Sequence, residues 1–171
     1  MDDMTSPHSD GTAAASRWDQ LPGLDDDEQN AWQHFLNSST HLLETLDHRL
    51  RAMHRLSLLD VRLLSLLAKS QRGAVRMSEL AHELTLIPSR VTAQVGRLES
   101  EGLVSRHPCP DDRRCVIAHI TQHGMARLAP ALRTYAHTVR ALYLNPLDRR
   151  QMTALGHSCG RISETLRDES H

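Results

Sequence analysis

Aromatic residues and lysine are nearly absent from this chain of 171 residues. Only five residues are aromatic, so aliphatic side chains have to fill the hydrophobic core. Of the 20 basic residues all but Lys69 are arginines. No apolar run approaches the roughly 18 residues of a membrane span, and the acidic N-terminus lacks the features of a signal peptide. We therefore expect a cytoplasmic protein without membrane contact.

Catalytic motifs are also lacking. The chain has no Gly-rich phosphate loop, metalloprotease helix or nucleophile elbow, so we predict that it is not an enzyme and uses no cofactor. Three cysteines, an odd number, do not build a disulfide framework and are thiols by default. His34, His41 and His48 recur every seven residues, but without a cysteine among them they favour a solvated surface over a zinc site, and we predict no metal.

The charge is unevenly distributed. The net charge of −1 argues against nucleic-acid binding when it is taken alone. Residues 1–60 carry −7, however, whereas residues 61–121 and 122–171 carry +3 each. Arginine reads guanine edges and narrow minor grooves, so the basic segments suit a nucleic-acid partner.

Apolar periodicity predicts helices at both ends of the chain. Residues 1–23 have no apolar period and indicate a disordered or loosely packed tail. One amphipathic helix of about 29 residues follows, from the acidic run after Leu24 to about Met53. Near the C-terminus we predict a helix from Gln122 to about Tyr143. A final helix runs to about Asp168, with Asn145 as its cap and Pro146 in its first turn.

The middle of the chain predicts a winged helix-turn-helix. Ser57 to Asp60 has the pattern of a capping box that opens a helix through Lys69. Two short helices follow, Ser78 to Leu84 and Pro88 to Glu101, joined by three residues. The period then changes to two, which predicts a β-hairpin of Leu103 to His107 and Cys115 to Ile120. The fold class is therefore mainly α with a small β-hairpin wing.

The second short helix has the side chains of a major-groove reader. Small residues allow close approach, and arginine and amide side chains offer bidentate contacts to base edges. The predicted contacts are Ser89, Arg90, Thr92, Ala93, Gln94 and Arg97, with Val91, Val95 and Leu98 on the opposite, inward face. Arg76 and Ser78 start the first short helix and are predicted phosphate contacts. By itself the second helix also fits a solvated amphipathic helix of another helical protein.

The sequence resembles the MarR family of bacterial transcriptional regulators over roughly residues 26–168. The matching segments are Ser78 to Ala81, Pro88 to Thr92, Arg97 to Glu99, Gly102 to Val104, Asp112 to Arg114 and Ile120 to Gly124. The resemblance implies a homodimer whose N- and C-terminal helices interlock, with two winged-helix lobes on a palindromic operator. It also implies a wing in which Asp112 orients Arg114 in the minor groove, with Arg113 placed for a phosphate.

Three residues depart from the family pattern. Ile87 stands where a Ser or Thr cap is usual, which costs the recognition helix about 1 kcal/mol. Gly96 inside the same helix costs up to about another 1 kcal/mol against Ala. Arg55 replaces a common Gly between the first two helices, so the shape of that junction is open.

Two kinds of effector site are candidates. Cys109 and Cys115 bracket the wing loop, and a disulfide between them would reshape the wing, although two ordinary thiols also fit the pattern. The family resemblance implies a pocket for a small aromatic or phenolic ligand. The candidate lining is Trp32, His41, Met53, His54 and Arg62, with Tyr135 nearby.

Together the residue patterns and the family resemblance predict a sequence-specific DNA-binding protein, and the resemblance implies that it is a homodimeric repressor that a small ligand or an oxidant releases. Residues 57–121 would form the DNA-binding lobe, and residues 24–56 and 122–168 the dimerisation helices. The alternative is a helical interaction or scaffold protein whose winged helix binds protein instead of DNA.

Overall fold

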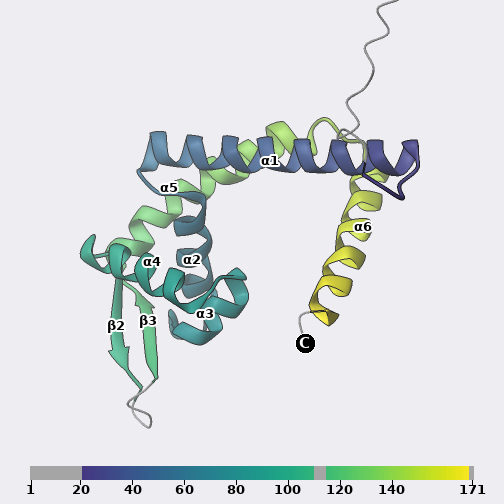
Figure 1. The fold of residues 1–171 in the computed structure, drawn as a ribbon. Helices are drawn as coiled ribbons and strands as arrows, with labels where there is room; N and C mark the ends of the chain where they lie inside the picture. The colour runs from purple at the N-terminus through teal and green to yellow at the C-terminus, as the bar shows by residue number, and fades with distance from the viewer. Residues whose placement is uncertain (1–20, 110–114, 170–171) are drawn as a thin grey trace, which may run out of the picture. The chain divides into compact units, whose positions relative to one another are not determined.

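The computed structural model describes residues 21–109 and 115–169 (Figure 1). The predicted Asp112, Arg113 and Arg114, and residues 1–20 of the predicted tail, lie outside the described residues. The elements are α1 (Asp26–His54), α2 (Leu58–Lys69), β1 (Ala74–Arg76), α3 (Met77–Leu84), α4 (Pro88–Ser100), β2 (Val104–Pro108), β3 (Val116–Ile120), α5 (Gln122–Val139), the π-helix η1 (Arg140–Leu144) and α6 (Arg149–Asp168). The predicted fold class, mainly helical with a hairpin wing, is confirmed.

Two compact units divide the chain between Thr40 and His41, inside α1. In the first unit, Asp25 and Glu28 form reciprocal side-chain to backbone hydrogen bonds of 2.9 and 3.0 Å at the start of α1. These bonds satisfy amides that a helix start leaves without partners. The rings of Trp32 and Phe35 lie 6.1 Å apart on the same helix. The 29-residue length of α1 confirms the predicted long helix.

The α1–α2 junction is built by two carboxylates and a left-handed residue. Arg55 has φ +56°, the conformation that glycine adopts most easily, which explains why the family pattern favours Gly there. The predicted capping box is confirmed: Ser57 and Asp60 exchange side-chain to backbone hydrogen bonds of 2.7 and 3.0 Å. Asp47 of α1 accepts a hydrogen bond of 2.8 Å from the Leu58 amide.

Asp47 is held in its charged form. Burial raises the pKa of Asp47, but the hydrogen bonds from the Arg51 side chain and the Leu58 amide together lower it by more than burial raises it. The pKa of Asp47 therefore lies below its usual value. The Arg51 Nε to Asp47 Oδ2 distance is 2.5 Å. The start of α2 is thereby tied to the end of α1 by a charged acceptor.

The sheet has three antiparallel strands in the order β1-β3-β2. The predicted hairpin is confirmed, with Val104 opposite Ile120 and Pro108 opposite Val116. The strand β1 was not predicted, because three residues are too few to show a period of two; it pairs with β3 through Ala74 and His119. Figure 1 shows α2, α3 and α4 gathered beside the β2–β3 hairpin.

Aliphatic side chains form the core, as the scarcity of aromatic residues predicts. Leu63, Leu64 and Leu67 of α2 are fully buried at its centre. Leu80 of α3 and Leu103 before β2 pack in the same cluster. This packing holds the helix-turn-helix and the wing to a single apolar centre, which fixes their mutual orientation.

The C-terminal helices differ from the prediction in two places. The helix that begins at Gln122 changes to π-helical geometry at Arg140 instead of continuing unchanged to Tyr143. The last helix is capped by Asp148 and not by Asn145, because Asp148 forms a capping box with Gln151. Asn145 instead donates its amide to the Arg140 carbonyl at the end of the π-helix.

None of the helices in the described ranges combines the length and the hydropathy that a bilayer crossing requires.

Gly124 provides a test of the contact between the wing and α5. A Cβ at this position would clash with the Leu103 carbonyl oxygen and come within 2.9 Å of Ile120. Gly124→Ala should lower the free energy of unfolding by about 1 to 3 kcal/mol, because the clash involves backbone that cannot rotate away. Thermal and urea unfolding at fixed protein concentration would measure the change.

Gly96→Ala in α4 is the matched control, because a Cβ there meets nothing within 4 Å. This variant should raise the free energy of unfolding by up to about 1 kcal/mol through helix propensity alone. Equal effects of the two substitutions would show that the Gly124 contact does not constrain the fold.

Candidate nucleic-acid interface

The helix-turn-helix is formed by α3, a three-residue turn and α4. Thr85 ends α3 in the left-handed conformation with φ +54°, and the Leu86 amide donates to the Ala81 carbonyl at 2.9 Å. Pro88 occupies the first turn of α4, where its missing N–H costs nothing. Ile87 is the N-cap and forms no side-chain cap hydrogen bond, which confirms the predicted lack of a cap.

Helix α4 has the inward and outward faces that the sequence predicts. Val91, Val95 and Leu98 are buried in the core. The exposed residues of its first two turns include four predicted base contacts: Ser89, Arg90, Thr92 and Ala93. The Thr92 hydroxyl donates to the Pro88 carbonyl at 2.9 Å, so it reaches a ligand only by rotating or by accepting.

Gln94 and Arg97, the other two predicted base contacts, have partners inside the protein. Gln94 Nε2 and Arg97 Nη2 both donate to Asp60 Oδ1 of α2. Arg97 Nη1 also donates to Glu101 Oε1 at 2.5 Å. Arg90, Gln94 and Arg97 follow each other at spacings of four and three, so they share one side of α4.

A polar hollow of about 390 Å³ lies where the wing meets the helix-turn-helix. The predicted phosphate contacts Arg76 and Ser78, both exposed, line it together with Thr92 and Arg106. The structure thus brings Thr92 of α4 next to the start of α3. Arg76, with the amides at the start of α3, gives this hollow the character of an anion site, whereas the charge of Arg106 is paired with Glu99.

An ion pair connects the wing to α4. Arg106 of β2 donates to Glu99 Oε2 through Nε at 2.8 Å and Nη2 at 2.5 Å, and its amide donates to Glu99 Oε1. The hydrogen bond from the Arg106 side chain lowers the pKa of Glu99 below its ordinary value. The pair connects the strand that begins the wing to the C-terminal end of α4. Sequence reasoning missed this pair, because the partners lie on different elements.

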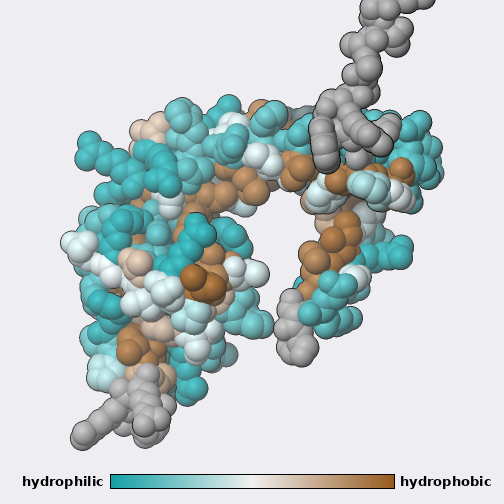
Figure 2. Space-filling view, in the orientation of Figure 1, coloured by the Kyte–Doolittle hydropathy of each residue, from teal (hydrophilic) through white to brown (hydrophobic). Residues whose placement is uncertain are grey.

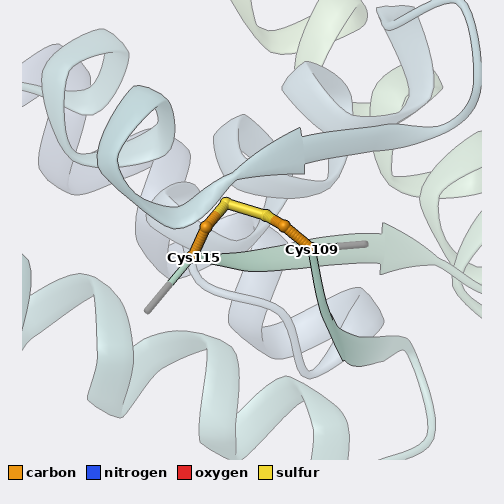
Figure 3. The surroundings of a disulfide bond; sticks show 2 residues. All are labelled: Cys109 and Cys115. Atoms are coloured by element: carbon orange, nitrogen blue, oxygen red, sulfur yellow. A yellow bond between two sulfur atoms is a disulfide. The ribbon is translucent and has the colours of Figure 1, made fainter. Parts of the chain in front are cut away.

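Cys109 and Cys115 face each other across the wing and are joined by a disulfide (Figure 3). Their Cα atoms are 5.3 Å apart, and the Cys109 amide donates to the Cys115 carbonyl at 3.0 Å. The expectation that all three cysteines are thiols is therefore wrong for this pair. The alternative hypothesis, a disulfide between Cys109 and Cys115 across the hairpin, is confirmed. Cys159 is unpaired and half-buried.

The candidate effector residues lie on different hollows. Arg62 lines a largely apolar cavity of about 380 Å³, to which α2, α3 and α5 contribute Leu66, Lys69, Leu84, Leu128, Leu132 and Tyr135. Met53 borders another hollow, with Arg133 and Thr138. A small aromatic or phenolic ligand at the Arg62 cavity stays a prediction.

Of the remaining candidates, His54 has hydrogen-bond partners on α5, whereas Trp32 and His41 are exposed. The His54 ring Nε2 lies 2.7 Å from Thr134 Oγ1 of α5, and the His54 carbonyl accepts from Arg127. Trp32 and His41 are exposed along α1. Among residues 21–109 and 115–169 no three His, Cys, Asp or Glu side chains gather as metal ligands.

Comparison with known proteins agrees with this geometry. The MarR family model matches residues 56–116, from two residues before α2 to the first residue of β3. Sco3205 from Streptomyces coelicolor, a MarR family transcriptional regulator whose crystal structure is in complex with DNA, is 31% identical. The match covers 84% of this chain and 90% of Sco3205, with a TM-score of 0.81.

Two further relatives extend the comparison. AbsC, a MarR family transcriptional regulator from S. coelicolor, is 30% identical with a TM-score of 0.81, and the match covers 86% of this chain and 99% of AbsC. The uncharacterized HTH-type transcriptional regulator YhbI of Bacillus subtilis is 33% identical over 94 residues, which are 55% of this chain and 60% of YhbI. The chain belongs to the MarR family of winged-helix transcriptional regulators.

Proposed function

We propose that this protein regulates transcription as a homodimer that binds a palindromic DNA operator. The observation that carries the proposal is the exposed first half of α4, which presents Ser89, Arg90 and Ala93 above a buried apolar face. A helix presented in this way fits the major groove, and the adjoining hollow with Arg76 and Ser78 supplies phosphate contacts. The DNA-bound structure of the relative Sco3205 supports the same partner for this chain.

The wing completes the proposed contact. Arg114, oriented by Asp112, would enter the minor groove beside the site of α4, and Arg113 would bind a phosphate. Operator occupancy would exclude the polymerase, so repression is the expected outcome. The rival reading, a winged helix that binds protein, requires the exposed face of α4 to have no affinity for DNA.

We infer the dimer from an apolar stripe along α6 that no other part of the described structure buries. None of the 20 residues of α6 is buried, although Met152, Leu155, Cys159 and Ile162 recur at the spacing of one helix face. Figure 2 shows this stripe as a brown band along α6. Trp32, Phe35 and Leu36 of α1 are likewise about 45% exposed. An isolated amphipathic helix is marginal in water, so a second copy of the chain is the proposed cover.

Base preference gives the first test. Selection from random duplexes should enrich a palindrome with half-sites one helical turn apart. Arg90→Ala should relax the preference at one base pair per half-site, a loss of about 1 to 3 kcal/mol in discrimination. Arg150→Ala, on exposed α6, is the control and should keep the wild-type preference. Absence of any enriched sequence for the wild type would favour the protein-binding reading.

Dimerisation gives the second test. Ile162→Glu places a charge in the exposed stripe of α6 and should convert the dimer to monomer, as measured by light scattering at micromolar concentration. Operator affinity should fall steeply, because one lobe then binds alone. Thr153→Glu, on an exposed position off the stripe, should leave the mass unchanged. A wild-type monomer would contradict the proposal directly.

Oxidation of the wing is the proposed release signal, carried by the Cys109 and Cys115 pair. A hydroperoxide oxidises one thiolate to a sulfenic acid and leaves as an alcohol or water. The second thiol then displaces water and forms the disulfide, so two thiols and one hydroperoxide give one disulfide. The new covalent ring closes around the five residues that include Arg114, and would therefore change its presentation to the minor groove.

Peroxide should lower operator affinity by about tenfold, within the range of ordinary allosteric coupling, and dithiothreitol should restore it. Cys109→Ser and Cys115→Ser should each remove the response, whereas Cys159→Ser should keep it. Electrophoretic mobility shift and thiol mass labelling on the same samples would measure both events. Unchanged affinity of a fully oxidised protein would remove the wing from redox control.

A further inference from the structure

Asp60 is a buried carboxylate that connects two helices of the DNA-binding lobe. It is the third residue of α2 and only 1% exposed. Its Oδ2 accepts from the Ser57 amide at 2.7 Å, which is its role in the capping box. Its Oδ1 accepts from Gln94 and Arg97 of α4. One carboxylate therefore both begins α2 and holds the recognition helix.

The burial of the Asp60 carboxylate carries a desolvation cost that its hydrogen bonds have to offset. A carboxylate removed from water needs hydrogen bonds and an opposite charge, otherwise its desolvation opposes folding. Both oxygens of Asp60 are engaged, and no buried side-chain polar atom in the described part of the chain lacks a hydrogen bond. Losing the bonds from α4 would expose this cost, so the carboxylate strongly favours a single placement of α4 on α2.

Arg97 is correspondingly weak as a DNA cation. Its side chain is 41% exposed, yet its guanidinium lies between the carboxylates of Asp60 and Glu101. The three groups together carry a net charge of −1. Binding to phosphates is driven by the release of counterions from DNA by unneutralised cations, so a doubly paired arginine contributes little to it. Arg90, on the same side of α4, forms no ion pair within the described residues.

The connection also reaches α1. The Leu58 amide, two residues before Asp60, donates to Asp47, and Asp47 accepts from Arg51 of α1. The residues around this junction, among them Asp47, Leu58, Arg90 and Gln94, line one common groove. The position of α4 therefore depends on its hydrogen bonds to Asp60, and through them on the α1–α2 junction, as well as on the apolar core.

We propose that Asp60 and Arg97 are positioning residues that set the register of the recognition helix on DNA, and that Arg97 does not itself bind DNA. This proposal rests on the proposed DNA-binding function. In it, Arg90 and the first turns of α4 contact the bases, and Arg97 acts on specificity only through Asp60.

The decisive measurement is the salt dependence of operator affinity. Arg97→Gln should keep the wild-type slope of log affinity against log salt concentration, whereas Arg90→Gln should reduce it by about 1 per protomer if Arg90 contacts a phosphate or base edge. A reduced slope for Arg97→Gln would identify Arg97 as a DNA contact and overturn the proposal.

Specificity separates positioning from mere stability. Arg97→Gln and Asp60→Asn should each lower the ratio of operator to random-duplex affinity about tenfold at a temperature where each is folded, with random-duplex affinity kept. The double variant should lose no more than either single variant, because one interaction is removed. An unchanged ratio together with a lower Tm would reduce the pair to a stabilising role and overturn the proposal.

Gln94→Ala keeps the experiment decisive if Asp60→Asn fails to fold. It removes one donor to Asp60 and leaves the ion pair, so a smaller loss of the same ratio is expected. An unchanged ratio in Gln94→Ala together with an unchanged ratio in Arg97→Gln would overturn the proposal. If the wild type itself does not distinguish its selected operator from random duplex, the proposed function fails, which is a different result from failure of the positioning role alone.

Discussion

The structure of the winged helix-turn-helix depends on the placement of one buried charge. Asp60 lies at the start of α2 in contact with α4, and its carboxylate has all its hydrogen-bond partners only when α2 and α4 are in their observed positions. The apolar contacts of Val91, Val95 and Leu98 hold α4 to the core but tolerate small shifts, because dispersion is not directional. Hydrogen bonds are directional, so the carboxylate selects one orientation among those that the core allows.

Polar connections of the same kind join the other parts of the lobe. Arg106 and Glu99 connect the wing to the C-terminal half of α4, while Asp47 connects α1 to the start of α2. The recognition helix is thus held at its middle by α2 and near its end by the wing. Its first turns carry no such restraint in the described structure and stay exposed. Rigid support behind an open first half suits the groove-reading role that we propose for α4.

The features with local causes were predicted well. The capping box of Ser57 and Asp60, the missing cap at Ile87 and the β-hairpin follow from neighbouring residues and periods of two or 3.6. The errors have specific causes. β1 is too short to show a period, and its strand character comes only from pairing with β3. The sequence predicts the start of the last helix at Asn145, but Asn145 and Asp148 are both good N-caps. The π-helix that ends at Leu144 decides between them, because Asn145 is its C-cap.

The sequence by itself determined the helical class, the winged helix-turn-helix and which face of α4 turns outward, because these depend on local spacing and on the burial of aliphatic side chains. Only the tertiary structure decided the partners of Gln94 and Arg97. Both were expected at DNA, since exposed polar residues on a recognition helix all look alike in sequence. Their carboxylate lies 34 and 37 residues away, and its reach depends on how α2 packs against α4. No local sequence pattern predicts this contact, because it forms only when α2 and α4 pack against the shared apolar core.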